Sequence, residues 1–169
     1  EGISKLNDQR AKFDILIFDW EGTLANTALH HKKNYHTQLF AGVELGIKEL
    51  KRQGYLLSIA TGKGRNSLNQ DLINTNLKDY FLITKTVDEC FSKPHPQMIM
   101  DILNFTMIDP QRALMIGDSP YDAEMANNAG VPCLGVAYGA ESLEQLKKFG
   151  TLDIIENSYD LFDWLRING

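Results

Sequence analysis

Two carboxylates follow an apolar run near the start of the chain. Residues 13–18 are mostly apolar or β-branched, which is the pattern of a strand buried on both faces. Asp19 and Glu21 come directly after this run, and Gly22 and Thr23 complete the cluster. An aspartate at the end of a rigid strand can attack phosphorus to form an acyl-phosphate, and a second carboxylate can donate or accept a proton. Taken alone, the pattern slightly favours an ordinary strand followed by a turn.

Polar residues also end two later apolar runs. Thr61 and Gly62 follow residues 55–60, and Asp118 follows residues 113–116. In an open parallel sheet the carboxyl ends of the strands meet at one edge, and ligands bind there. Three such strand ends favour one shared site over three unrelated turns, so we expect these side chains to lie close together.

Each of these residues also has an ordinary interpretation. Thr61 alone is most simply a strand-end threonine, and Lys93 in a proline-rich loop could be solvated surface. Asp118 could cap the helix that follows, although Ser119 is the better candidate for the cap. Asp122 can bind a metal directly or orient the metal's waters and Lys93, and we favour the supporting role. The combination of residues decides between the interpretations.

Four motifs together resemble the haloacid dehalogenase superfamily. They are, in this order, Asp19-x-Glu21-Gly22-Thr23, Thr61-Gly62, Lys93-Pro94 and Gly117-Asp118-Ser119-x-x-Asp122. The resemblance extends over residues 13–136, and the last motif is most similar to the phosphoglycolate-phosphatase-like branch. It implies a three-layer α/β fold with a doubly wound parallel sheet, and a Mg²⁺-dependent phosphatase that works through an aspartyl-phosphate.

The resemblance also implies a role for each motif residue. Asp19 is the nucleophile, and Asp19 and Asp118 hold Mg²⁺, an ion that prefers carboxylate oxygens and keeps several waters. The backbone carbonyl of Glu21 is a further implied ligand of the metal. Thr61, Gly62 and Lys93 hold the phosphoryl oxygens, by hydrogen bonds and by a point charge.

Glu21 departs from the family pattern. Hydrolytic members usually carry aspartate at this position, as general acid and then general base. The extra methylene of Glu21 moves the carboxylate by about one bond, and a misplacement on the order of 1 Å can cost about a hundredfold in rate. Three outcomes follow: a slow phosphatase, a phosphatase with adjusted geometry, or a catalytically weak protein that binds phosphate and metal and acts through interactions.

The chain has little room for the helical cap that related phosphatases insert. Residues 24–40 allow only a short flap, in which His30 and His31 are most simply a solvated face. A cap excludes water from the site. We therefore expect either a homo-oligomer or a phospho-substrate that is bulky enough to cover the site itself, although a phosphorylated small molecule is also compatible with the motifs.

Composition limits the number of domains, the kinds of partner and the classes of protein that the chain can represent. The 169 residues suit one domain, 1–169, with a loose polar leader at 1–10. A net charge of −5 gives no reason to expect nucleic acid or membrane as a partner. Two cysteines are too few for a disulfide scaffold, so a cytoplasmic location is the default. A signalling receiver domain uses similar residues, but its acidic pair comes first in the chain and its phosphorylated aspartate later.

Strand and helix patterns alternate along the chain, which predicts parallel strands joined by right-handed helical crossovers. We expect strands at 13–18, 55–60, 80–84, 113–116, 132–136 and 153–155. We expect helices at 43–53, 67–74, 97–105, 120–129, 143–149 and 159–167. In the second helix, Leu68, Leu72 and Ile73 are expected to face the core.

Overall fold

The computed structural model describes residues 11–26, 36–138 and 143–169. Our predictions for the leader at 1–10, for the tip of the flap and for His30 and His31 lie outside these ranges. In the described residues, parallel strands form one sheet in the order β3-β2-β1-β4-β5-β6. The strands are β1 (Ile15–Phe18), β2 (Leu56–Ala60), β3 (Ile83–Lys85), β4 (Ala113–Gly117), β5 (Cys133–Val136) and β6 (Ile154–Ile155).

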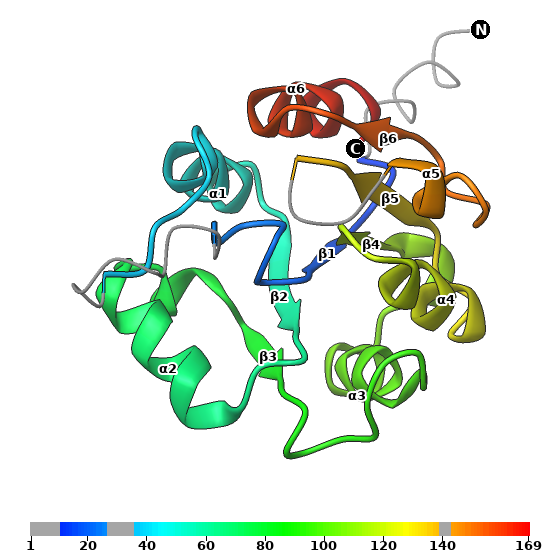
Figure 1. The fold of residues 1–169 in the computed structure, drawn as a ribbon, viewed down its shortest axis with the longest axis horizontal. Helices are drawn as coiled ribbons and strands as arrows, with labels where there is room; N and C mark the ends of the chain where they lie inside the picture. The colour runs from blue at the N-terminus through cyan, green and yellow to red at the C-terminus, as the bar shows by residue number, and fades with distance from the viewer. Residues whose placement is uncertain (1–10, 27–35, 139–142) are drawn as a thin grey trace, which may run out of the picture.

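Helices cover both faces of the sheet and make three layers (Figure 1). They are α1 (Val43–Arg52), α2 (Arg65–Asn74), α3 (Gln97–Thr106), α4 (Pro120–Asn128), α5 (Leu143–Leu146) and α6 (Ser158–Asn168). The short 3-10 helices are η2 (Lys78–Tyr80) and η3 (Pro110–Arg112). The predicted α/β fold with a doubly wound parallel sheet is therefore confirmed.

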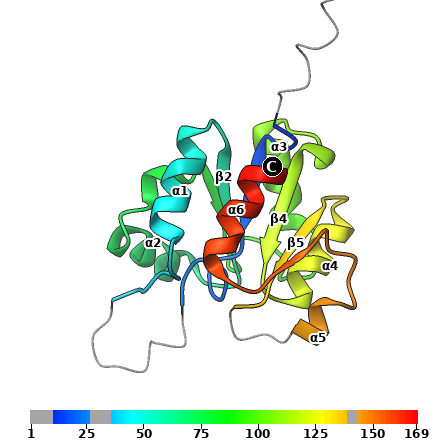
Figure 2. The same cartoon turned by 90° about the horizontal axis from the view of Figure 1, so that it is seen from above.

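Alternation along β1 divides the core into two clusters, because successive side chains of a strand point to opposite faces. Leu16 and Phe18 pack with buried residues of α1, α2 and α6. Ile15 and Ile17 pack with buried residues of α3 and α4. In Figure 2, α1 and α6 lie side by side in front of the strands. All four residues of β1 are buried, as a central strand covered on both faces requires.

The central position of β1 brings the predicted site together. Phe18 pairs with Ile59 of β2 on one side and with Ile116 of β4 on the other. The three strands consequently end at the same level of the sheet. Asp19 lies directly after β1, and its amide donates a hydrogen bond to the Ile116 carbonyl at 2.9 Å. Thr61 and Asp118 stand immediately after the two neighbouring strands.

Three local predictions were wrong. The helix expected at 143–149 ends at Leu146, because the amides of Lys148 and Phe149 bond to carbonyls three residues back and form a turn. The strand expected at 80–84 begins at Ile83, because residues 78–80 form η2. In α2, Ile73 is 55% exposed, whereas Asp71 is buried. Asp71 and Leu72 stand three and four residues after Leu68, which places all three on one helix face. Asp71, and not Ile73, therefore occupies the buried face of α2, where its hydrogen-bond and ion-pair partners offset the cost of burying a carboxylate.

The stem of the segment 24–40 is a pair of antiparallel arms. Ala25 forms an antiparallel bridge with Leu39. The Asn26 amide donates to the Gln38 carbonyl at 2.7 Å, and the Phe40 amide donates to the Leu24 carbonyl at 2.9 Å. This pairing returns the chain to α1 beside the end of β1. Among the described residues, no helix is long and apolar enough to span a membrane.

Candidate active site

Three aspartates gather at the end of β1. Ligand oxygens of Asp19, Asp118 and Asp122 all lie within 4.8 Å of one another, and the three residues are buried. The Lys93 ammonium lies 2.9 Å from Asp19 Oδ1 and 2.6 Å from Asp122 Oδ1. The structure therefore brings four of the predicted site residues into direct or close contact. They come from the turn directly after β1, from the loop before α3, from the position directly after β4 and from α4.

Burial and crowding determine the charges in this cluster. The pKa of Asp19 is raised to about 7, chiefly by burial and also by the neighbouring Asp118, against the opposing effect of Lys93. Burial likewise raises the pKa of Asp118 and of Asp122 to about 6. Burial lowers the pKa of Lys93, but Asp122 and Asp19 outweigh it and raise that pKa above its usual value. One ammonium faces three carboxylates, so the cluster favours an additional cation.

The start of α4 gives Asp122 two roles. Ser119 is the N-cap, and its hydroxyl accepts a hydrogen bond from the Asp122 amide. The Asp122 Oδ2 in turn accepts from the Ser119 amide at 3.2 Å, which completes a capping box. The Oδ1 atom faces Lys93. The prediction that Ser119 is the cap is confirmed, and Asp122 holds the lysine as well as the helix terminus.

A tight turn after β1 presses its backbone against the carboxylates. The amides of Leu24 and Ala25 both donate to the Trp20 carbonyl, at 3.0 and 2.9 Å. Gly22 has φ +82°, and a Cβ built there would overlap the Asp118 carboxylate. Glycine is therefore required at this position by both conformation and space. The Tyr138 hydroxyl donates to the Thr23 carbonyl at 2.7 Å and ties the turn to the end of β5.

Thr61 and Gly62 form the β2 side of the site. The Thr61 hydroxyl oxygen accepts from the Lys63 amide at 3.0 Å, so its proton is directed elsewhere. A Cβ built at Gly62 would meet nothing within 4 Å, which leaves open space beside this backbone. A free hydroxyl proton beside an open loop suits a phosphoryl oxygen. Binding of a phosphoryl oxygen is the role predicted for Thr61 and Gly62 from the sequence.

Glu21 differs from the other predicted residues. Its carboxylate does not join the buried cluster, and its side chain is 47% exposed. Glu21 Oε1 accepts from the Lys63 ammonium at 2.9 Å. The same ammonium lies 2.6 Å from Asp71 Oδ2. Asp71 also accepts from Trp20 Nε1 at 3.0 Å and from the Thr37 hydroxyl at 2.7 Å.

Sequence reasoning missed Lys63 and Asp71. One signal was present, because Asp71 stands three residues after Leu68 and directly before Leu72 on the apolar side of α2. An acidic residue on a buried helix face needs partners. Those partners come from the turn after β1, from the loop after β2 and from residue 37, and the sequence alone does not connect them.

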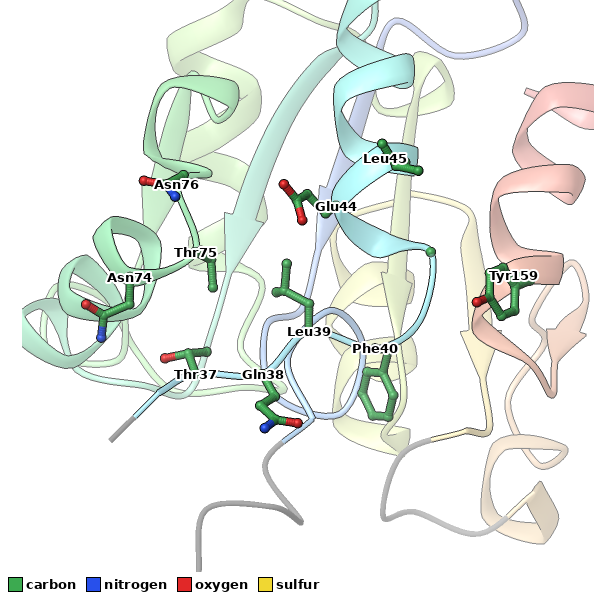
Figure 3. A pocket seen from close by; sticks show the side chains of 11 residues that line it. Thr37, Gln38, Leu39, Phe40, Glu44, Leu45, Asn74, Thr75, Asn76 and Tyr159 are labelled. Atoms are coloured by element: carbon green, nitrogen blue, oxygen red, sulfur yellow. The ribbon is translucent and has the colours of Figure 1, made fainter. Parts of the chain in front are cut away.

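The hollow of about 630 Å³ near α1 is a different place. Figure 3 shows its lining side chains between the segment before α1, the end of α2 and the start of α6. None of the predicted site residues lines it. Thr37, on its edge, is the contact between this hollow and the Asp71 cluster. The aspartate cluster, and not this hollow, has the groups that can do chemistry.

The aspartate cluster fits a divalent cation with a preference for oxygen. Its donors are carboxylate oxygens from three different elements, at mutual distances that one ion can bridge. The close approach of Gly22 to Asp118 keeps the backbone of the turn beside the same carboxylates. The donor chemistry therefore suits a hard divalent cation, and the Lys93 ammonium is a positive charge already present beside it.

Comparison with known proteins agrees with the geometry. A family model described as "Haloacid dehalogenase-like hydrolase" matches residues 27–136. The chain belongs to this family. Among curated relatives of this haloacid dehalogenase-like chain, Pyrophosphatase PpaX of Bacillus mycoides (strain KBAB4) is 30% identical over 125 residues, which are 73% of the chain and 58% of the relative. The corresponding protein of Bacillus cereus (strain B4264) is 30% identical over 116 residues, 68% of the chain and 54% of the relative.

Solved structures of the family have the same fold. A predicted phosphatase from Clostridium acetobutylicum gives a TM-score of 0.82 at 21% identity, over 92% of this chain and 99% of that one. A haloacid dehalogenase superfamily hydrolase from Ehrlichia chaffeensis gives 0.77 at 17% identity, over 94% and 98%. These identities support the fold alone. The chain spans somewhat more than half the length of the curated relatives it matches.

Proposed function

We propose that this haloacid dehalogenase-like chain is a Mg²⁺-dependent phosphatase that hydrolyses a phosphate monoester or anhydride through an aspartyl-phosphate on Asp19. The observation that carries the proposal is the position of Asp19. It is buried at the end of the central strand, 2.9 Å from the Lys93 ammonium and inside a cluster of three carboxylates. Buried titratable groups whose pKa values are shifted by desolvation and by a charged partner gather at functional sites.

The first step transfers the phosphoryl group to Asp19. A carboxylate oxygen of Asp19 forms a bond to phosphorus while the bond from phosphorus to the leaving oxygen breaks. The carboxyl group of Glu21 gives its proton to that leaving oxygen. Thr61, the Gly62 amide and Lys93 hold the phosphoryl oxygens, whose charge they offset.

The second step restores the protein. A water oxygen bonds to phosphorus, the bond from phosphorus to Asp19 breaks, and the Glu21 carboxylate accepts the proton of the water. Inorganic phosphate leaves, and both carboxyl groups return to their starting forms. Mg²⁺ held by Asp19 and Asp118, with Asp122 beside them, would supply positive charge against the repulsion between two anions.

A second candidate function rests on one specific observation. The Glu21 carboxylate is engaged by Lys63 at 2.9 Å and lies outside the cluster that contains Asp19. This arrangement favours a catalytically weak relative that binds phosphate and metal and acts through interactions. Glu21 nevertheless stands two residues after Asp19 in the same turn, and its exposed side chain keeps a carboxylate at the rim of the site, so we rank the phosphatase first.

The test is a phosphate-release screen with Mg²⁺, in which the wild-type protein is compared with Asp19→Asn. The panel should contain small phosphate monoesters, bulky phosphorylated ligands and inorganic pyrophosphate, since the two curated relatives described above carry the name pyrophosphatase. We expect release by the wild-type protein and a loss in the variant. Equal release by both proteins would reject the role of Asp19, and binding without release would favour the second candidate. A cytoplasmic location and a homo-oligomeric state of this protein stay predictions.

A further inference from the structure

Lys63 connects Glu21 to a buried carboxylate. The Lys63 ammonium lies between Glu21 Oε1 at 2.9 Å and Asp71 Oδ2 at 2.6 Å. The lysine side chain is only 14% exposed and that of Asp71 only 11%, whereas that of Glu21 is 47% exposed. Exposed ion pairs hold their partners weakly, because water and salt screen them. The Lys63 ammonium is fixed by the buried carboxylate of Asp71, so it can hold the exposed carboxylate of Glu21 more firmly than a solvated lysine would.

Asp71 is itself fixed from two sides. Its Oδ2 atom accepts from the indole of Trp20 at 3.0 Å, and its Oδ1 atom accepts from the Thr37 hydroxyl at 2.7 Å. Trp20 is fully buried and directly precedes Glu21 in the chain. Figure 3 shows Thr37 beside the C-terminal end of α2. The position of the Lys63 ammonium is therefore determined by the protein core and not by solvent.

The backbone of Lys63 is equally well held. Its amide donates to the Thr61 hydroxyl oxygen at 3.0 Å, and its carbonyl accepts from the Val87 amide at 3.2 Å. The residue therefore lies directly beside the proposed phosphate-binding hydroxyl and reaches across to the residue proposed as acid and base. No other cation in the described residues forms an ion pair with Glu21.

We propose that Lys63 is a positioning residue that holds the Glu21 carboxylate at the rim of the site for the second step, in which this carboxylate accepts the proton of the attacking water. The inference rests on the proposed phosphatase function. It gives the departure from the family pattern a role, since the longer side chain of Glu21 extends toward Lys63 and its Oε1 lies 2.9 Å from the ammonium. In this chain, the glutamate and the lysine work as one unit anchored on Asp71.

The experiment is a double-mutant cycle on kcat with Glu21→Gln, Lys63→Met and the combined variant. We expect Lys63→Met to lower kcat by about tenfold to a hundredfold, the cost of a misplacement on the order of 1 Å, with little change in KM. Lys63→Arg should restore most of the rate. The combined variant should be no slower than Glu21→Gln alone, because Lys63 acts only through Glu21.

Glu21→Asp gives a second and independent arm, because this exposed residue can be shortened without affecting the fold. We expect it to lower kcat in the wild-type background and to have no such effect in Lys63→Met. The matched control is the exposed pair of Lys48 and Glu44, at 3.0 Å on α1, whose Lys48→Met variant should keep the wild-type kcat. Thermal unfolding of every variant separates a loss of fold from a loss of positioning.

Three results would overturn the inference while the phosphatase function stands. They are independent, multiplicative losses in the combined variant, a raised KM with normal kcat in Lys63→Met, and a faster Glu21→Asp protein. The second of these would make Lys63 a substrate-binding residue. A wild-type protein that releases no phosphate from any ester or from pyrophosphate would overturn the proposed function and the inference together.

Discussion

Substitution of Gly22 by alanine separates the effect of backbone strain from the effect on the carboxylate cluster. Gly22 has φ +82°, and a Cβ at this position would lie 2.7 Å from Cγ of Asp118 and closer still to Oδ2. Ordinary van der Waals contact begins near 3.4 Å. Since Gly22 stands in a turn closed by backbone hydrogen bonds, the Asp118 carboxylate is the group that must move.

Gly54 provides the matched control. It has φ +98°, and a Cβ there would meet nothing within 4 Å. Placement of an alanine in the left-handed region costs about 1–2 kcal/mol at either position. Gly22→Ala adds a displacement of Asp118 on the order of 1 Å, and such a misplacement can cost about a hundredfold in rate.

Urea unfolding and Mg²⁺-dependent phosphate release measure the two effects. We expect both variants to lose a similar amount of stability from the backbone, with a further loss for Gly22→Ala from the overlap. Gly54→Ala should keep its kcat, and Gly22→Ala should lose about two orders of magnitude. Equal kcat values for the two variants would show that the turn of Gly22 does not position Asp118.

Three further predictions concern groups around the site. Mg²⁺ should raise the melting temperature of the wild-type protein, because it relieves the repulsion between the buried carboxylates. The increase in melting temperature should be smaller in Asp118→Asn. An equal increase in both proteins would place the ion elsewhere. Asp71→Asn should cost on the order of 1–3 kcal/mol in urea unfolding, because the Lys63 ammonium loses its buried partner. Tyr138→Phe should cost about 1 kcal/mol in the same assay, because the Thr23 carbonyl loses its donor, and an unchanged midpoint would show that water replaces the hydroxyl.

The strand and helix pattern of the chain predicts most of the fold. Buried parallel strands are nearly continuous apolar runs, so β1, β2 and β4 were placed to within a few residues. The edge strand β3 was shifted, because its residues are only half buried and its apolar signal is weak. The inward face of α2 was misread for a different reason. Ile73 is the more apolar residue, but Asp71 occupies the buried face because three distant donors satisfy its oxygens.

The candidate site was predictable where it depends on strand ends and was not predictable where it depends on side-chain conformation. Asp19, Thr61 and Asp118 follow adjacent parallel strands, and sheet topology alone brings them together. The contact between Glu21 and Lys63 joins residues 42 positions apart in the chain. It depends on the directions of two long side chains, and neither residue type nor spacing specifies those.

In the mechanism that we propose, Asp19 carries the phosphoryl group between the two steps. The most direct test is to quench the protein with acid during turnover, reduce any acyl-phosphate with borohydride, and locate the modified residue by peptide mass spectrometry. We expect conversion of Asp19 to homoserine, with Asp118 and Asp122 unmodified and no conversion in the absence of substrate. Steady phosphate release with an unmodified Asp19, or with the modification on another residue, would exclude Asp19 as the nucleophile.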